Sequence, residues 1–224
     1  SERVKQMFAV EAAILEGLGY GNSQVPRLYA YFTENHQFYL AQEYVQGKTR
    51  SETIASSGSL SESGVREVLI AILNVLDYVH RKGIVHRDIK PENIIIRSSD
   101  NLPVLIDFGA VRETMAAQIN SHGGVTSSIV IGTPGFMSME QAAGRAVFAS
   151  DFYSLGLVAI YLLTAQMPQE LQTDSYTGEI IWQKNGISPN FALVLDKAIR
   201  SQLRERFSSA REMLDALQPT STVQ

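Results

Sequence analysis

The fold of this chain is decided by the stretch His86-Arg87-Asp88-Ile89-Lys90-Pro91-Glu92-Asn93, which is followed further along by Asp107-Phe108-Gly109. Both stretches lie at the ends of short apolar segments. Ile94-Ile95-Ile96 begins directly after the first stretch, and Val104-Leu105-Ile106 runs straight into the second. The end of a buried strand is rigid, so polar side chains placed there are held in fixed positions, as a phosphate and metal site requires. The pattern therefore predicts a chemical site where two strands end.

Four side chains in these stretches suit phosphoryl transfer. Asp88 can accept the proton of an attacking hydroxyl group, and Lys90, two residues on, can reach the phosphate that is transferred. Asn93 and Asp107 offer the hard oxygen ligands that Mg²⁺ prefers. Asp88, Lys90, Asn93 and Asp107 are therefore the candidate catalytic residues.

The order and spacing of these motifs resemble the eukaryotic-type serine/threonine protein kinase family across nearly the whole chain. A lone Asp107-Phe108-Gly109 would be weak support, because three residues recur by chance. Two motifs in the right order make a strong signal, and the stretch Ser150-Asp151-Phe152-Tyr153-Ser154-Leu155-Gly156 adds a third part of the pattern. The sequence of the C-terminal half is similar to that of bacterial members of the family, and especially of cyanobacterial ones.

Apolar periodicity predicts strands early and helices late. Residues 4–16 form one helical stripe, and 26–32 and 37–41 are typical of two strands around a polar turn. Further helices are expected over 65–79, from Asp151 to about Leu163, and over 191–199 and 209–217. The resemblance implies an α+β, two-lobed protein kinase-like fold. We expect a partial N-lobe at 1–45, a mainly helical C-lobe at 46–218 and a polar tail at 219–224.

Glu11 lies on the apolar stripe of the first helix, where a carboxylate is costly to bury without a cation. The residues alone favour a solvent-exposed Glu at the edge of the stripe. The resemblance instead assigns Glu11 to the helix glutamate that pairs with a strand lysine contacting the ATP phosphates. It also makes the connector between the lobes an adenine site, with the backbone of Glu43 and Val45 at the adenine edge and Gln42 at the rear.

The resemblance implies supporting roles for further residues. Phe108 would pack under the first helix, next to Gly109, and Asp151 would hold the catalytic-loop backbone, although a carboxylate near a helix start is also a plain cap. Glu140 would form a buried ion pair with Arg206, with Ser138 and Met139 replacing the Ala and Pro that the family usually has before this Glu. Thr133 would hydrogen-bond near Asp88 and Lys90.

His86 and Arg87, which precede the proposed base Asp88, are expected to have different roles. His86 follows an apolar pair, which favours a buried supporting histidine over proton chemistry. Kinases with an Arg at the position of Arg87 often need a phosphate on the activation segment, and the available acceptors are Thr126, Ser127 and Ser128. An unmodified loop is an equally good interpretation of this Gly- and Ser-rich stretch.

The composition limits the class of protein. The chain has 224 residues, 45% of them hydrophobic, a net charge of −4 and no cysteine, so we expect no disulfide, no thiolate metal site and no nucleic-acid footprint. The longest apolar run, Leu155 to Leu163, is far shorter than the roughly 20 residues that span a bilayer. No signal peptide is recognised, and a cytoplasmic protein is expected.

Kinases place a Gly-rich strand pair and a strand lysine before the helix that holds the Glu11 equivalent, and the sequence contains neither. Two explanations compete: a fragment of a longer active kinase, or a kinase-like binding or scaffold module without catalysis. The intact set of catalytic residues favours the first. We therefore expect a serine/threonine kinase that uses ATP and Mg²⁺ on protein substrates, weak or inactive in these 224 residues alone. A small-molecule kinase is a third possibility. The stretch Gly132 to Phe136 argues against it, because it resembles the part of protein kinases that receives the substrate peptide.

Overall fold

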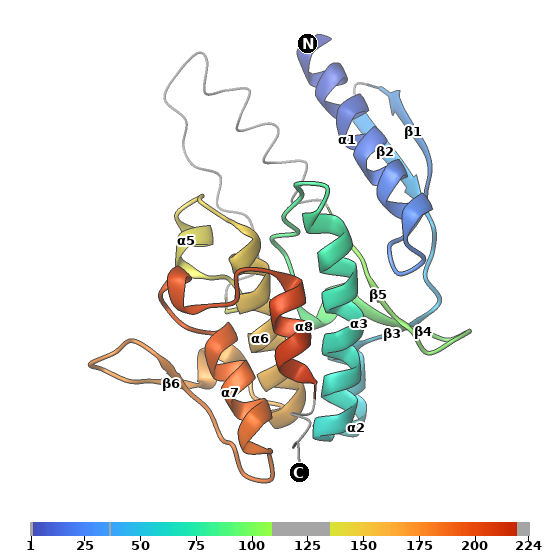
Figure 1. Cartoon of the computed structure of the whole chain (residues 1–224). Helices are drawn as coiled ribbons and strands as arrows, with labels where there is room; N and C mark the ends of the chain where they lie inside the picture. Colours follow the sequence, from blue (N-terminus) through green and yellow to red (C-terminus); the bar gives the residue numbers. More distant parts are fainter. Residues whose placement is uncertain (1, 36, 109–134, 219–224) are drawn as a thin grey trace.

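The computed structural model describes residues 2–35, 37–108 and 135–218, with side chains described from Ala12 onward except that of Phe38. Within these residues Figure 1 shows two parts. One consists of a long helix beside a strand pair, and the other is a larger body made mostly of helices. The loop that contains Asp88 leads through a short 3₁₀ helix into a small sheet.

The first part contains α1 (Glu2–Gly21), β1 (Leu28–Glu34) and β2 (Gln37–Gln42). The two strands pair antiparallel, with Phe32 opposite Tyr39 and their rings stacked 5.2 Å apart. Ala12, Leu15 and Leu18 of α1 are buried, as the stripe in the sequence predicts. The helix is longer than the predicted 4–16, because it continues through three glycines to Gly21.

Two of these glycines are required by close packing rather than by a phosphate loop. A Cβ atom on Gly19 would lie 2.6 Å from the Pro26 carbonyl oxygen, and one on Gly21 would lie 2.0 Å from the Tyr78 hydroxyl oxygen. The Tyr78 hydroxyl donates to the carbonyl oxygens at Gly17 (3.0 Å) and Leu18 (3.2 Å). The glycines therefore let the end of α1 dock on the helical body.

A second sheet carries the candidate site. It consists of β3 (Gly47–Thr49), β4 (Ile94–Arg97) and β5 (Pro103–Leu105), in that order and antiparallel throughout. A short 3₁₀ helix, η1 (Pro91–Asn93), leads into β4. The loop after α1 is attached to this sheet, because the Leu105 amide donates to the Gln24 carbonyl oxygen at 2.9 Å.

The helical body is built around α6 (Phe148–Thr164), of which nearly every residue from Ser150 to Leu162 is buried. A helix that is apolar on all sides belongs in the interior, and Figure 1 shows it surrounded by other elements. The elements of the body are α2 (Arg50–Ser57), α3 (Glu62–His80), α5 (Met139–Ala142), α6, η2 (Pro168–Glu170), β6 (Gln172–Thr173), β7 (Ile180–Ile181), α7 (Pro189–Ala198), η3 (Leu203–Glu205) and α8 (Ala210–Leu217).

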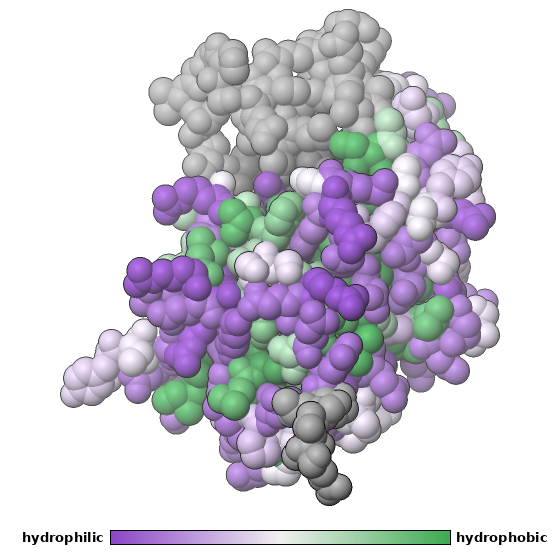
Figure 2. Space-filling model, in the orientation of Figure 1, coloured by the Kyte–Doolittle hydropathy of each residue, from purple (hydrophilic) through white to green (hydrophobic). Residues whose placement is uncertain are grey.

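The face of the molecule in Figure 2 is mostly hydrophilic, with small hydrophobic areas dispersed over it. No helix in the described part of the chain has the length and apolar character needed to cross a membrane.

Arg50, at the start of α2, is the basis of a stability prediction. Its Nε is buried and has no hydrogen-bond partner among the described residues. Burial lowers the pKa of the Arg50 guanidinium, and the negative charge of Glu67 opposes this only in part. Because a buried donor without a partner costs about 1–3 kcal/mol, we expect Arg50→Leu to raise the free energy of unfolding by about 1 kcal/mol.

Denaturant unfolding measures this change, and Arg81→Leu is the matched control. The Arg81 side chain is 74% exposed in a surface pair with Asp77, so its replacement should alter stability by less than about 0.5 kcal/mol. If Arg50→Leu destabilised the protein instead, Arg50 would have a stabilising role that this interpretation does not include.

Candidate active site

Asp88, Lys90 and Asn93 lie together around one carboxylate. The Lys90 ammonium is 2.8 Å from Oδ2 of Asp88, and the Asn93 Nδ2 donates to the same oxygen at 3.0 Å. Asn93 Nδ2 also donates to the Asp88 carbonyl oxygen at 2.7 Å. Asp88 and Lys90 remain partly open to solvent, with 16% and 21% of their side chains exposed. Asp88 is therefore held in place while it stays accessible to a substrate.

Asp107 is brought to the same place by the pairing of β4 with β5. Ile94 is opposite Leu105, and the Ile106 amide donates to the Asn93 carbonyl oxygen at 2.9 Å, so the chain at Asp107 leaves the sheet beside Asn93. The Asp107 backbone has φ of 61°, in the left-handed region that few residues other than glycine adopt. Such strain is concentrated at functional sites, where the surrounding structure enforces it.

The backbone from His86 to Asp88 is held almost entirely by side chains from other elements. Asp151 Oδ2 accepts from the His86 amide and Oδ1 from the Arg87 amide, both at 2.9 Å. The Gln141 Nε2 donates to the Arg87 carbonyl oxygen, and Asn93 holds the carbonyl oxygen of Asp88. Arg87 has φ of 69°, and this strained residue is fixed by contacts at both its amide and its carbonyl oxygen.

His86 joins this loop to the end of β5. It is fully buried, and its Nδ1 accepts from the Asp88 amide at 3.3 Å, which assigns the ring proton to Nε2, 3.2 Å from the Ile106 carbonyl oxygen. Its ring meets the Phe108 ring edge-on, with centroids 4.6 Å apart. Burial lowers the pKa of His86 despite the negative charges of Asp151, Asp88 and Asp107, so the imidazole is neutral at pH 7.

Asp151 is fully buried and accepts a third contact, from His80 Nε2 at 2.8 Å to its Oδ2. The His80 ring stacks on Phe148, with centroids 4.5 Å apart. Asp151 does not also cap its helix, because the N-cap of α6 is Val147. Helix α6 already begins at Phe148, and the carboxylate bonds to the loop at residues 86–87 because it points out of its own helix.

Glu140 and Arg206 form the expected buried ion pair. Arg206 Nη1 is 2.8 Å from Oε1 and Nη2 is 3.1 Å from Oε2, a two-pronged geometry. The hydroxyl groups of Ser138 (2.5 Å) and Ser150 (2.6 Å) also donate to Oε1. Burial raises the pKa of Glu140, but the hydrogen bonds from Arg206, Ser138 and Ser150 outweigh it and hold the pKa at about 2.

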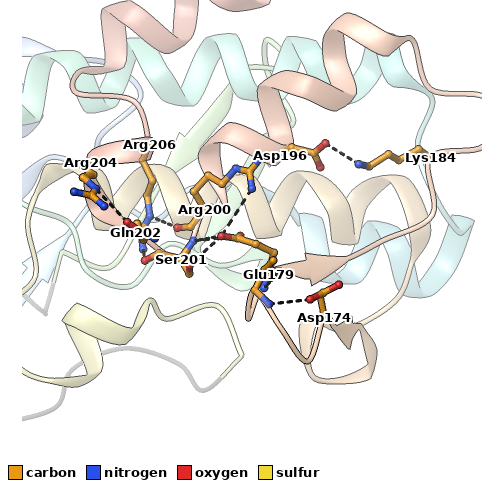
Figure 3. A network of polar contacts seen from close by, with 10 residues as sticks. Asp174, Glu179, Lys184, Asp196, Arg200, Ser201, Gln202, Arg204 and Arg206 are labelled. Carbon is orange, nitrogen blue, oxygen red and sulfur yellow. Dashed lines mark hydrogen bonds and ion pairs between the residues drawn. The ribbon is translucent and has the colours of Figure 1, made fainter.

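Arg206 is itself anchored from the other side. Its Nε donates to the Arg200 carbonyl oxygen at 2.6 Å and its Nη2 to that of Ser201 at 3.1 Å. Figure 3 shows this contact and its continuation, in which the Ser201 hydroxyl donates to Glu179 on the β6–β7 hairpin at 2.9 Å. The ion pair is thus fixed to the helical body at both ends.

The donor set fits magnesium and a polyphosphate. Because both nearby acceptors belong to Asp88, the Asn93 amide nitrogen is committed to them and its Oδ1 is the ligand oxygen that remains. With the Asp107 carboxylate this gives two hard oxygen ligands, the number that Mg²⁺ commonly takes from protein when phosphates and water supply the rest. Among the described residues, no group of three or more His, Asp or Glu side chains could hold a metal without such help.

The other predicted site residues are distributed as follows. In the connector, Val45 is buried, Gln42 is exposed, and the Glu43 amide donates to the Arg27 carbonyl oxygen at 2.7 Å. The Glu43 amide is therefore already paired within the protein. The backbone of Glu11 lies in α1, but its side chain is not described. The remaining predictions fall outside the described residues, at Gly109, Thr126, Ser127, Ser128 and Thr133.

Four supporting residues were not found from the sequence. Gln141 contacts the catalytic loop, His80 contacts the Asp151 carboxylate that holds this loop, and Ser138 and Ser150 complete the contacts of Glu140. Ser138 stands out in the sequence only as a departure from the usual family residue. Gln141 gives no signal, because nothing in the periodicity of a single helical turn relates it to Arg87.

Comparisons with known proteins agree with this geometry. A family model described as protein kinase domain matches residues 1–217. Serine/threonine-protein kinase PknA of Nostoc sp. is 60% identical over 217 residues, covering 96% of this chain and 38% of its own length. Serine/threonine-protein kinase C of Synechocystis sp. is 50% identical over 217 residues, covering 96% and 41%. The chain thus spans about two fifths of the length of these curated relatives.

Among solved structures, the PknI kinase domain of Mycobacterium tuberculosis is similar, with a TM-score of 0.68, 25% sequence identity, and coverage of 97% of this chain and 78% of that one. The expected α+β kinase-like fold with a mainly helical C-terminal part is confirmed. From the motifs, the fold and the cyanobacterial relatives together, the chain belongs to the eukaryotic-type serine/threonine protein kinase family.

Proposed function

We propose that the protein transfers the γ-phosphate of ATP to serine or threonine hydroxyl groups of protein substrates, with Mg²⁺. The observation that carries the proposal is the contact of Lys90 and Asn93 with the Asp88 carboxylate, next to the strand end that bears Asp107. An acid, an ammonium and two hard oxygen ligands in one place supply the positioning and charge that phosphoryl transfer needs. The family and the relatives support the same reaction.

Each residue has a proposed part in this reaction. Asp88 orients the acceptor hydroxyl and takes its proton, and Lys90 neutralises charge on the phosphate that moves. Asn93 and Asp107 would hold Mg²⁺, which when bound neutralises the charge of the phosphates. The main chain at Glu43 and Val45 would receive the adenine, with Gln42 at the rear and Glu11 available to a lysine of the ATP site.

Further residues have proposed roles that support the catalytic ones. We propose that His86 supports the loop as a neutral, buried ring, and that Arg87 receives a phosphate placed on Thr126, Ser127 or Ser128. We propose, as the resemblance implies, that Thr133 hydrogen-bonds near Asp88 and Lys90 and that Phe108, next to Gly109, packs under the first helix. We also propose a lobe boundary near residue 45, a C-lobe to residue 218, and reaction in the cytoplasm because the cosubstrate is ATP.

A test uses the protein as its gene encodes it. With labelled ATP, Mg²⁺ and a generic protein substrate, Asp88→Asn should lower the rate of transfer by at least about 100-fold, because the group that takes the proton is lost. Asp77→Asn is the matched control. Asp77 forms a surface pair with Arg81 on α3, and its variant should keep the wild-type rate. Absence of magnesium-dependent transfer by the wild-type protein would overturn the proposal.

The binding-module alternative rests on the sequence, which has no Gly-x-Gly-x-x-Gly segment. It predicts that Asp88→Asn still restores the phenotype of a strain from which the gene has been deleted. The enzyme proposal predicts that this variant fails to restore it, while the Asp77→Asn control succeeds.

For the 224 residues by themselves we propose weak nucleotide binding and little turnover. The backbone amides of a Gly-rich strand pair, which cover the phosphates in kinases, are not encoded within them. Isothermal titration of this polypeptide with ATP and Mg²⁺ should give a dissociation constant no tighter than about 1 mM. A micromolar constant would contradict this expectation.

A further inference from the structure

Arg87 is a strained residue that is held on both sides, at its amide and at its carbonyl oxygen. Arg87 has φ of 69°, a conformation that a residue with a side chain keeps only when its surroundings enforce it. Its amide donates to Asp151 Oδ1 at 2.9 Å, from α6. Its carbonyl oxygen accepts from Gln141 Nε2, from α5. Two elements that follow the catalytic loop in sequence therefore fix one strained residue beside the proposed base.

We propose that Gln141 is a positioning residue for phosphoryl transfer, which acts by holding the Arg87–Asp88 peptide and through it the Asp88 carboxylate. This inference rests on the proposed function for its kinetic part. Gln141 is 3% exposed, so its amide is enclosed where it meets the Arg87 carbonyl oxygen. Without this donor the peptide is free to rotate toward a conformation with negative φ at Arg87, and the direction of Asp88 would change.

Helix α5 can hold a peptide in place only if it is itself fixed, because a single helical turn is not stable alone. Glu140, the residue of α5 that precedes Gln141, anchors the helix through the ion pair with Arg206 and the hydroxyl groups of Ser138 and Ser150. Arg206 is in turn tied to the carbonyl oxygens at Arg200 and Ser201, as Figure 3 shows. Consecutive residues of one turn thus point two ways, with Glu140 toward the helical body and Gln141 toward the catalytic loop.

The chemistry of the contact explains why an amide suits this position. A carbonyl oxygen needs a donor, and a neutral amide supplies one without placing another charge next to Arg87 and Asp88. The length of the side chain matters as well, since removal of one methylene group withdraws the nitrogen by more than 1 Å. A shift of about this size near a reacting centre can lower a rate about 100-fold.

The experiment compares three variants of the full-length protein with the wild type. Gln141→Met keeps the shape and removes the donor, and Gln141→Asn keeps the amide but shortens its reach. Gln202→Met removes an exposed glutamine that accepts from Arg204 and serves as the control. We expect kcat to fall 10-fold to 100-fold in both Gln141 variants, KM for ATP to change less than about twofold, and the control to match the wild type.

Amide hydrogen exchange, resolved to single residues, gives a second readout that does not need turnover. The Asp88 N–H belongs to the same peptide as the Arg87 carbonyl, so its exchange should become at least 10-fold faster in Gln141→Met. The His86 and Arg87 amides, which Asp151 holds, and the amides of α6 should keep their wild-type rates.

The outcomes separate the two proposals. A wild-type protein that shows no transfer overturns the proposed function, and with it the catalytic role of Gln141. An active wild type whose Gln141 variants keep kcat within twofold, or keep slow exchange at Asp88, overturns the role of Gln141 alone. A rise in KM for ATP with unchanged kcat would also contradict it, because the residue would then serve nucleotide binding.

Discussion

Replacement of Glu140 by Gln should lower the free energy of unfolding by about 3–5 kcal/mol, one of the largest single effects that we expect. The variant leaves the Arg206 guanidinium, whose side chain is 1% exposed, without its negative partner. It also weakens the acceptor of the Ser138 and Ser150 hydroxyl groups. Denaturant unfolding of the wild type and the variant at pH 7 measures the difference.

The pH dependence of this difference provides a stricter test. The pKa of Glu140 is about 2 in the folded protein and has an ordinary value of 4.5. A lowered pKa stabilises the folded protein fully above the ordinary value, and this contribution is lost as the pH falls through the folded value. The gap between wild type and Glu140→Gln should therefore be constant above about pH 5 and narrow as the pH falls from 4.5 toward 2.

The matched control is Asp215→Asn, which removes a surface pair with Arg211 whose side chains are 68% and 59% exposed. Exposed pairs of this kind contribute about 0.3–0.5 kcal/mol. If Glu140→Gln cost no more than this control, the ion pair at Glu140 would not be a buried one in solution.

Replacement of Asp151 by Asn should lower kcat of the full-length protein by at least about 100-fold, because the loop that carries Asp88 loses its main support. Asp151 is fully buried and accepts from the amides of His86 and Arg87 and from the His80 ring. An Asn side chain has only one acceptor oxygen, so at least one of these donors would be left unsatisfied. We expect a loss of about 3 kcal/mol in the free energy of unfolding as well.

Asp196→Asn is the control for this variant. Asp196 also joins separate elements, accepting from Trp182 Nε1 at 2.9 Å and from Lys184 Nζ at 2.6 Å, as Figure 3 shows in part. It lies on α7 and contacts no residue of the catalytic loop in the described contacts, so kcat should stay within about twofold of the wild type. Equal kinetic losses in both variants would mean that Asp151 acts only through overall stability.

The sequence alone predicted the features that come from apolar periodicity and the features that come from the resemblance to the kinase family. The apolar stripe of α3 and the ends of β4 and β5 follow from the apolar pattern of the sequence. The motif spacing predicted that Asp88, Lys90 and Asn93 lie together, and in the structure they contact one another. The Glu140–Arg206 pair, 66 residues apart, came from the resemblance. These features are specified by local pattern or by family motifs, which a single sequence carries.

The rest depends on contacts that no local pattern carries. The three-residue strand β3 is too short to show alternation, and the extension of α1 through Gly19 and Gly21 depends on how closely Pro26 and Tyr78 approach. The contact of Gln141 with Arg87 joins residues 54 positions apart through one side chain. Tertiary packing decides such features, so they became visible only in the folded chain.

The most direct test of the central claim is a structure of the full-length protein with Mg²⁺ and a non-hydrolysable ATP analogue. We expect oxygens of Asn93 and Asp107 to bind the metal at about 2.0–2.1 Å. We also expect the Lys90 ammonium to lie within about 3 Å of the terminal phosphate. A nucleotide bound elsewhere, or bound here with these three side chains turned away from its phosphates, would contradict the account.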